Sequence, residues 1–247
     1  MRIAVISDIH GNLEALSSVI SDIRSRCVDK IICLGDVVGY GVNPNECIEK
    51  VQTECEYSII GNHEAAIFDA TVFQEFNDLA KSAIQWTRDN LNSRSIDFIN
   101  SLAIEKIDGD FSFVHSTPYE PNSWYYISSM EDAVFNFNFF STKFCLIGHT
   151  HVPGVMVMEN NSTVVSVLRT TEFNYGRDFS ENAKYMINVG SVGQPRDKNP
   201  KSCYALIDTD TKNIALHRVS YDIVQCQRKM HAAKMPEFLI QRLAKGM

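Results

Sequence analysis

The sequence predicts a single α/β domain, and three features support this prediction. Short apolar runs rich in β-branched residues recur along the chain and are typical of buried strands. In the first part of the chain, stretches with a helical period of apolar residues separate these runs. No repeat, low-complexity tract or Pro/Gly-rich linker divides the chain, so residues 1–247 are expected to form one domain.

The N-terminal part of the chain predicts a βαβ unit. Residues 2–6 (RIAVI) and 30–34 (KIICL) are apolar runs that fit buried strands. Between them, apolar residues recur at helical spacing: Leu13, Leu16, Ile20, Ile23 and Cys27. A strand, a helix and a second strand in this order predict parallel pairing with a right-handed crossover.

The next segments continue this alternation. A helix is predicted over 44–54 and a strand over 57–60. Apolar residues along one helical face then predict a helix over 71–91, and a shorter helix is expected over 94–102. The sequence leaves open whether this helical region packs on the core or forms a lid.

From residue 111 onward the sequence is richer in strands. The predicted strands cover 111–115, 144–148, 154–158, 163–168, 185–189, 203–208 and 213–219. The turn-forming segment DTDTKN separates the last two, so these strands are expected to pair as a hairpin. A helix is predicted to begin near Tyr221, and the tail from 236 to 245 is expected to be helical.

The composition excludes several classes of protein. Hydrophobic residues make up 45% and charged residues 21%, which is typical of a globular fold and argues against disorder. The net charge of −7 disfavours stable binding to nucleic acid, because such binding needs basic surfaces. The seven cysteines are odd in number and form no CxxC pair, which indicates reduced thiols. Since no signal peptide or transmembrane span is found, a cytoplasmic protein without membrane contact is expected.

Metal-competent residues gather where the predicted strands end. In open α/β sheets, functional groups collect at the carboxyl ends of strands. Five such ends carry them here: Asp8-Ile9-His10, Gly35-Asp36, Gly61-Asn62-His63-Glu64, His115 and Gly148-His149-Thr150-His151. Carboxylates, amide oxygens and imidazoles suit divalent ions such as Mn, Fe, Co, Ni or Zn. The sequence therefore predicts a metal site.

Each of these residues alone also has a structural explanation. Asp8 could cap the helix that follows it, and Asp36 after a glycine could be an ordinary turn residue. His115 at the end of an apolar strand could be a hydrogen-bonded core histidine. His149 and His151 alternate along an extended segment and share a side, which packing explains less well. Five separate strand ends that all offer ligands favour a shared site.

These five blocks, in this order and spacing, resemble the calcineurin-like metallophosphoesterase superfamily. The resemblance runs from the first predicted strand to residue 151. A later segment, Asn188-Val-Gly-Ser-Val-Gly-Gln-Pro-Arg196, is similar to part of a small bacterial branch of predicted diadenosine tetraphosphatases. The resemblance implies a four-layer α-β-β-α sandwich, in which two mixed β-sheets face each other and helices flank them.

The resemblance also implies roles for individual residues. One divalent ion would be held by Asp8, His10, Asp36 and His151, and a second by Asp36, Asn62, His115 and His149. Asp36 would bridge the two ions, and His63 would contact the scissile phosphate and assist the leaving group. Manganese is the expected ion, with iron, zinc, nickel and cobalt as alternatives.

The sequence thus predicts hydrolysis of phosphate mono- or diesters, with nucleotides and dinucleoside polyphosphates among the candidate substrates. A metal-bridging hydroxide is the expected nucleophile, and Asp36 and His63 are the expected catalytic residues. The candidate substrate contacts are Asn62, His63, Tyr40, Arg196 and Trp124. Trp124 or Tyr125 could stack on a nucleobase, or these aromatic residues could pack beneath their loop or in a subunit contact. Arg196 could instead be an exposed turn residue.

Two other functions remain open on the sequence. The first is a Ser/Thr protein phosphatase, but the segment Gly35-Asp36-Val-Val-Gly-Tyr40-Gly41 lacks the arginine that grips phosphate in those members of the superfamily. Arg196 could substitute for it. The second is a non-catalytic scaffold for protein partners, as the retromer subunit of this fold is. That scaffold lacks the catalytic histidine, whereas His63 and the full ligand set are present here, which favours catalysis.

Overall fold

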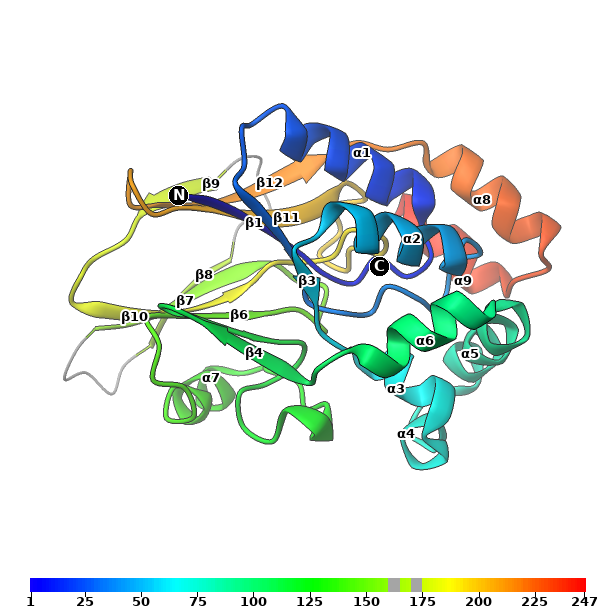
Figure 1. Ribbon diagram of the computed structural model, residues 1–247, viewed down its shortest axis with the longest axis horizontal. Helices are drawn as coiled ribbons and strands as arrows, with labels where there is room; N and C mark the ends of the chain where they lie inside the picture. The colour runs from blue at the N-terminus through cyan, green and yellow to red at the C-terminus, as the bar shows by residue number, and fades with distance from the viewer. Residues whose placement is uncertain (160–164, 170–174) are drawn as a thin grey trace.

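Two six-stranded sheets face each other between layers of helices in the computed structural model, which describes residues 1–159, 165–169 and 175–247 (Figure 1). The first sheet has the order β3 (Tyr57–Ser58), β2 (Lys30–Cys33), β1 (Arg2–Ile6), β11 (Ser202–Asp208), β12 (Asn213–Val219) and β9 (Tyr175–Asp178). The second has the order β4 (Glu105–Asp108), β5 (Phe111–Val114), β6 (Phe144–Ile147), β10 (Ala183–Asn188), β7 (Gly154–Glu159) and β8 (Val165–Arg169).

Both sheets are mixed. β1 pairs with β2 in parallel, as the βαβ pattern predicted, and β2 pairs with β3 in parallel. β5, β6 and β10 are also parallel to one another, whereas the remaining pairs are antiparallel. The predicted hairpin is confirmed, because β11 and β12 pair antiparallel from Ser202↔Val219 to Asp208↔Asn213.

The main hydrophobic core lies between the two sheets. Alternation along β1 shows how the sequence produces it: Ile3 and Val5 face the second sheet, whereas Ala4 and Ile6 face the helices. A strand buried on both faces therefore has the continuous apolar sequence that identified it. Aromatic side chains fill much of the space on the second sheet, where Phe111 and Phe144 stack with ring centroids 5.0 Å apart.

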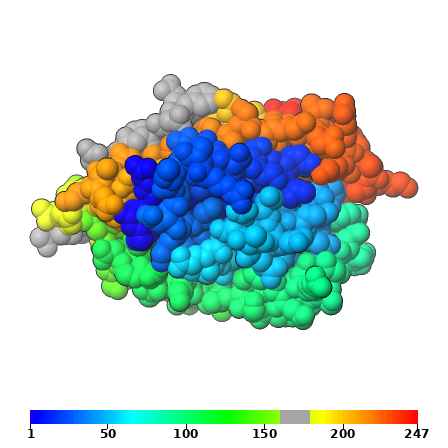
Figure 2. All heavy atoms as spheres, turned by 45° about the horizontal axis from the view of Figure 1, so that its top comes forward, coloured from blue at the N-terminus to red at the C-terminus, as the bar shows by residue number. Residues whose placement is uncertain are grey.

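Helices cover both outer faces. The outer face of the first sheet packs against α1 (Leu13–Arg24), α2 (Pro44–Glu54), α3 (Asn62–Phe68), α5 (Asp78–Asn90) and α6 (Ser93–Ser101). The outer face of the second sheet packs against α7 (Met130–Asn136). Helix α8 (Ile223–Ala232) lies beside α1 (Figure 2), where Lys229 Nζ is 2.5 Å from Glu14 Oε1. These layers confirm the predicted α-β-β-α sandwich.

The predicted helix over 71–91 is wrong, because two helices occupy this region. α4 covers Ala70–Gln74, and α5 begins only at Asp78. Asn77 separates them: its backbone is extended, and its side chain accepts a hydrogen bond from the Ala80 N–H at 3.0 Å. An asparagine cap starts a new helix here even though the apolar period continues on both sides.

Other differences are smaller. Helices α3 and α7 and strands β4 and β9 were not predicted. The strand predicted over 163–168 agrees with β8 from residue 165 onward, and its first two residues lie outside the described residues. The C-terminal tail forms α9 (Glu237–Gln241) and a 3₁₀ turn, η2 (Arg242–Ala244), as expected. None of the described helices combines the length and apolar composition that crossing a bilayer requires.

Candidate metal centre

The seven predicted ligands come from five loops that meet at one end of the facing sheets. Asp8 and His10 follow β1, Asp36 follows β2, Asn62 begins α3, His115 follows β5, and His149 and His151 follow β6. Parallel strands end on the same side of a sheet, which explains why loops distant in sequence meet here. All seven side chains are buried, and the structure brings them together in one cluster.

The cluster divides into two groups that share Asp36. Ligand atoms of Asp8, His10, Asp36 and His151 lie within 4.8 Å of one another, and so do those of Asp36, His115 and His149. Asp36 Oδ2 is 3.7 Å from His10 Nε2 in the first group and 3.3 Å from His115 Nε2 in the second. Asn62 joins the second group, since its Oδ1 is 3.2 Å from His115 Nε2. One carboxylate therefore stands between two sets of potential ligands.

Five of the ligands have a left-handed backbone. Asp8, His10, Asp36, His149 and His151 have φ values between 51° and 65°. For residues other than glycine this conformation costs roughly 1–2 kcal/mol each, and it concentrates at functional sites. The cost indicates that the surrounding structure holds these side chains in place against the preference of the local sequence.

Hydrogen bonds orient the imidazole rings of three ligands. The Nδ1 atoms of His10, His115 and His151 lie 3.1, 2.9 and 2.6 Å from the main-chain oxygens of Val38, Leu34 and Gln194. A carbonyl oxygen can only accept a hydrogen bond, so each Nδ1 must carry the hydrogen and donate that bond. The Nε2 atom of each neutral ring then has a lone pair that faces the cluster. His149 uses the opposite nitrogen: its Nε2 donates to the Trp124 carbonyl at 3.0 Å, and its Nδ1 is left for the cluster.

This arrangement fits divalent cations. His10 Nε2 and His151 Nε2 are 3.1 Å apart, and both carry lone pairs when their Nδ1 atoms donate. His151 Nε2 is also 3.2 Å from Asp8 Oδ1, a buried oxygen without a hydrogen-bond donor among the described residues. Acceptors that crowd together out of contact with water need a positive charge between them. Imidazole nitrogen and carboxylate oxygen are ligands for Mn, Fe, Co, Ni and Zn.

The electrostatics of the cluster lead to the same conclusion. Burial raises the pKa of Asp36, but the nearby His115 and His63 more than offset this effect and hold it well below its ordinary value. Burial lowers the pKa of His149 to about 3. Burial also lowers the pKa of His115, but the Asp36 carboxylate outweighs it and raises the value to about 9. Without a cation, the negative charge of the buried Asp36 carboxylate is therefore balanced by a proton on His115.

Glu64 holds two of the ligand loops together, a role that the sequence did not reveal. It is fully buried, and its Oε2 accepts from the main-chain N–H groups of Asp36 at 2.8 Å and Gly61 at 2.9 Å. Its Oε1 accepts from the Val38 N–H at 2.9 Å. Burial raises the pKa of Glu64 to about 7, whereas the N–H donors oppose this rise. The available signal was the spacing of Gly61 and Glu64: the glutamate three residues after the N-cap accepts from the N-cap N–H, which is the half of a capping box that a glycine allows.

Glu64→Gln is expected to destabilise the fold and weaken the metal centre. The glutamine offers one acceptor oxygen and places an NH₂ group against main-chain donors, which should cost about 1–3 kcal/mol of unfolding free energy. Because Glu64 positions the Asp36 loop, metal affinity should fall about 10- to 100-fold. Denaturant unfolding of metal-free protein and metal titration measure the two effects. Glu49→Gln, on the exposed face of α2, is the control, and wild-type values for both variants would contradict this role.

The segment from Asn188 to Arg196 contacts the main chain of the Asp8 loop. Ser191 Oγ donates to the Asp8 main-chain oxygen at 2.8 Å, and the Gly193 N–H donates to the same oxygen at 2.9 Å. A Cβ on Gly193 would lie 1.8 Å from the Ile9 oxygen, so only glycine fits this close approach. The conformation of the Asp8 loop therefore depends on a segment that is distant in sequence.

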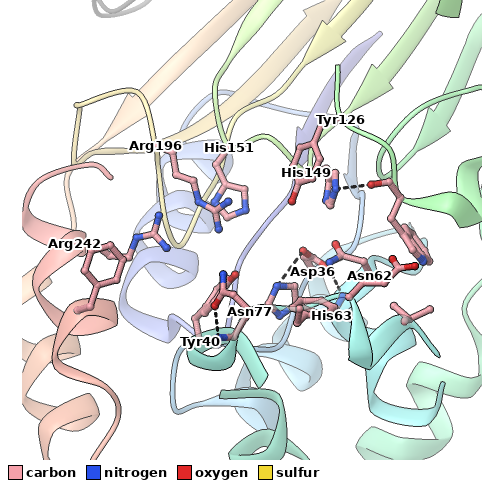
Figure 3. A pocket seen from close by; sticks show the side chains of 16 residues that line it. Asp36, Tyr40, Asn62, His63, Asn77, Tyr126, His149, His151, Arg196 and Arg242 are labelled. Carbon is pink, nitrogen blue, oxygen red and sulfur yellow. Dashed lines mark hydrogen bonds and ion pairs between the residues drawn. The ribbon is translucent and has the colours of Figure 1, made fainter. Parts of the chain in front are cut away.

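A cleft of about 390 Å³ opens beside the cluster (Figure 3). Asp36, Asn62, His63, His149 and His151 form the wall on the side of the cluster. The predicted contacts Tyr40, Arg196 and Trp124 also line it. The remaining walls come from α4, α5 and the turn between them and from the C-terminal helix, through Val72, Glu75, Phe76, Asn77, Ala80, Phe238 and Arg242. The helical region whose role the sequence left open thus flanks the cleft.

Two aromatic side chains of one loop contribute differently to the cleft. Trp124 is 9% exposed, and its ring lies against His115 with centroids 6.1 Å apart. Tyr126, which was not among the predicted contacts, is 54% exposed and stacks on His149 with centroids 4.1 Å apart. Its position next to a ligand histidine could not be derived from the sequence, because the loop has no regular period. Tyr126 is therefore the more accessible aromatic surface of the two.

The sequence matches the family described as the calcineurin-like phosphoesterase superfamily domain over residues 1–212. An uncharacterized protein of Methanocaldococcus jannaschii is 38% identical over 250 residues, which cover 99% of this chain and 98% of that protein. The crystal structure of a metallophosphoesterase from Sphaerobacter thermophilus is similar with a TM-score of 0.87 and 39% identity, covering 100% of this chain and 99% of that one. A hypothetical protein from Pyrococcus horikoshii shares the fold at 19% identity, with a TM-score of 0.77 over 100% of this chain and 98% of its own. This chain belongs to the calcineurin-like phosphoesterase superfamily.

Proposed function

We propose that this protein hydrolyses phosphate mono- or diesters with the help of two divalent cations, manganese being the expected ion. The observation that carries the proposal is the position of Asp36, whose Oδ2 faces ligand nitrogens of both groups at 3.7 and 3.3 Å. A shared carboxylate is characteristic of two-metal phosphoesterase sites. The adjoining cleft of about 390 Å³ is within the size range of small-molecule sites, which favours a small phosphorylated substrate.

The predicted ligands form two cation sites that share Asp36. Asp8, His10, Asp36 and His151 would hold one cation, and Asp36, Asn62, His115 and His149 the other. When bound, the cations would acidify a water molecule and neutralise negative charge on the phosphoryl oxygens. By accepting hydrogen bonds from Nδ1, the carbonyls of Val38, Leu34 and Gln194 hold three histidines in the tautomer whose Nε2 lone pair faces the cluster.

His63 is the group available to the leaving oxygen. It lines the cleft without belonging to either ligand group, and its Nε2 is 4.0 Å from Asp36 Oδ2. Rings on three sides fix its orientation, with centroid distances of 4.6 Å to Tyr40, 4.6 Å to His10 and 4.8 Å to Phe76. A positioned imidazole at this point can donate a hydrogen bond or a proton to the departing alkoxide.

Removal and return of metal test the proposal. Metal-free protein should not hydrolyse bis(p-nitrophenyl) phosphate, and reloading with two equivalents of Mn²⁺ should restore turnover. At about 100 times its dissociation constant, Mn²⁺ should stabilise the fold by about 2.7 kcal/mol for each site that it fills, which corresponds to a Tm increase of roughly 5–10 °C per site at this chain length. Metal analysis, calorimetry and an absorbance assay measure these three quantities.

A panel of phosphomonoesters, diesters, dinucleoside polyphosphates and phosphopeptides then ranks the substrate classes. Preference for phosphopeptides would favour the protein-phosphatase alternative. Tight binding of two ions with no turnover of any ester would contradict catalysis and favour a metal-binding scaffold.

A further inference from the structure

Two arginine side chains line the same cleft although they are far apart in sequence. Arg196 follows β10 in the segment that contacts the Asp8 loop, and Arg242 begins the turn η2 after α9. Both line the cleft, and Figure 3 shows their guanidinium groups turned toward one another on the side of His151 and Tyr40. The second arginine therefore extends the positively charged wall of the cleft away from the metal cluster.

Neither guanidinium group forms an ion pair with an Asp or Glu side chain in the described part of the chain. Arg196 donates from Nε and Nη2 to Gln194 Oε1, at 3.3 and 2.9 Å, and Arg242 donates from Nε to the main-chain oxygen of Met247. Other arginines do pair with carboxylates: Arg2, Arg24, Arg26 and Arg218. Among the described residues, therefore, no acidic side chain pairs with either guanidinium group, although Glu75 lines the same cleft.

Aromatic rings support both guanidinium groups. Arg196 Cζ lies 5.8 Å from the centroid of the Tyr40 ring, and Arg242 Cζ lies 5.4 Å from that of Phe238. Such contacts fix the plane of a guanidinium group and leave its edge free for an anion. Burial and, after it, the charge of Arg196 lower the pKa of Arg242 to about 10, so Arg242 keeps its charge at neutral pH and is repelled by that of Arg196. An anion between them would relieve this repulsion.

We infer that Arg196 and Arg242 together bind a second phosphoryl group of the substrate, one that is not hydrolysed. This inference rests on the proposed function, because it assigns the scissile phosphate to the metal cluster. Tyr40 is next to both His63 and the arginine pair. Its ring centroid lies 4.6 Å from that of His63 and 5.8 Å from Arg196 Cζ. A phosphoryl group has enough oxygens to engage two guanidinium groups at once, and its charge matches theirs. The substrate class is a phosphate ester that carries a further phosphoryl group.

Binding of AMP, ADP and adenosine 3′,5′-bisphosphate tests this inference. Calorimetry is done on Mn²⁺-loaded protein carrying His63→Gln, which slows turnover and leaves both ligand groups intact. ADP or the bisphosphate should bind about tenfold more tightly than AMP, as expected for new hydrogen bonds between charged groups. Arg242→Gln should reduce this preference to near unity, and Arg242→Lys should retain part of it. Arg228→Gln, an exposed charge on α8, is the matched control and should keep the full preference.

The outcomes separate this inference from the proposed function. A preference for ADP alone places the second phosphoryl group next to the first, and a preference for the bisphosphate alone places it farther away; either supports the inference. Equal binding of all three nucleotides, or a preference that survives Arg242→Gln, overturns it. If wild-type protein hydrolyses bis(p-nitrophenyl) phosphate but shows no such preference, the second phosphoryl site is rejected and the proposed phosphoesterase activity stands. If the preference is found but no ester is hydrolysed, the arginine pair still binds a phosphoryl group and the proposed phosphoesterase activity is rejected. Unfolding curves confirm that each variant is folded.

Discussion

Asp36→Asn is expected to lower kcat/KM for phosphate esters by at least about 100-fold, since even an outer partner of a metal ligand contributes about 10- to 100-fold. Asparagine keeps the shape of the side chain and the Oδ1 that accepts a hydrogen bond from the main-chain N–H of His63 at 2.9 Å. It removes the charge and turns an NH₂ group toward His10 and His115. Metal content should fall from two ions to one or fewer, as measured by metal analysis beside steady-state kinetics.

The control for Asp36→Asn is Asp97→Asn, which makes the same change on the exposed face of α6. This variant should keep both metal content and turnover. Asp36→Asn protein that retains two ions and turns over near the wild-type rate with added Mn²⁺ would show that Asp36 does not bridge. Retention of one ion with loss of turnover agrees with the proposed division into two groups, because each group keeps ligands of its own.

Much of the fold could be predicted because the chain alternates between two clear periods. The βαβ unit from β1 to β2 and the β11–β12 hairpin are examples, since apolar runs and turn residues mark them without ambiguity. β4 escaped prediction because its four residues are all exposed and show no apolar pattern. The interruption before α5 escaped because Asn77 acts through a side-chain cap and leaves the apolar period unchanged.

The candidate metal ligands could be predicted because their chemical types and their places at strand ends are both visible in the sequence. The conformations that aim them could not. The left-handed backbone at Asp8 and Asp36 depends on contacts with Ser191, Gly193 and Glu64, which are distant in sequence or were not assigned a role. Residue types reveal which side chains can bind a cation, whereas tertiary contacts decide how they meet.

The walls of the cleft were even less accessible to prediction. Arg242 and Phe238 belong to a short C-terminal helix and turn, and no period or motif connects them with Asp36. Only the packing of α8 and α9 against the Tyr40 loop brings them to the cleft. The walls of the cleft are therefore the part of the candidate site that the sequence alone reveals least.

His63→Gln is expected to lower kcat by about 10²- to 10⁴-fold for esters with poor leaving groups, while both cations stay bound. His63 lies outside the two ligand groups, and it is 3% exposed at the wall of the cleft. An alkoxide needs a proton as it leaves, whereas p-nitrophenolate is stable without one. The loss of kcat should therefore be about tenfold or more larger for an alkyl ester than for a p-nitrophenyl ester.

The comparison of leaving groups distinguishes proton donation from other roles of His63. An equal loss for both esters would indicate that the imidazole binds the phosphoryl oxygens and does not protonate the leaving group. A fall in metal content together with kcat would show that His63 acts through the ligands, with Asp36 as the contact at 4.0 Å. His231→Gln, an exposed histidine at the end of α8, is the control and should change neither quantity. Because His63 is, among the described residues, the one histidine of the cleft outside both ligand groups, selective loss with alkyl esters would place the proton donor at its imidazole.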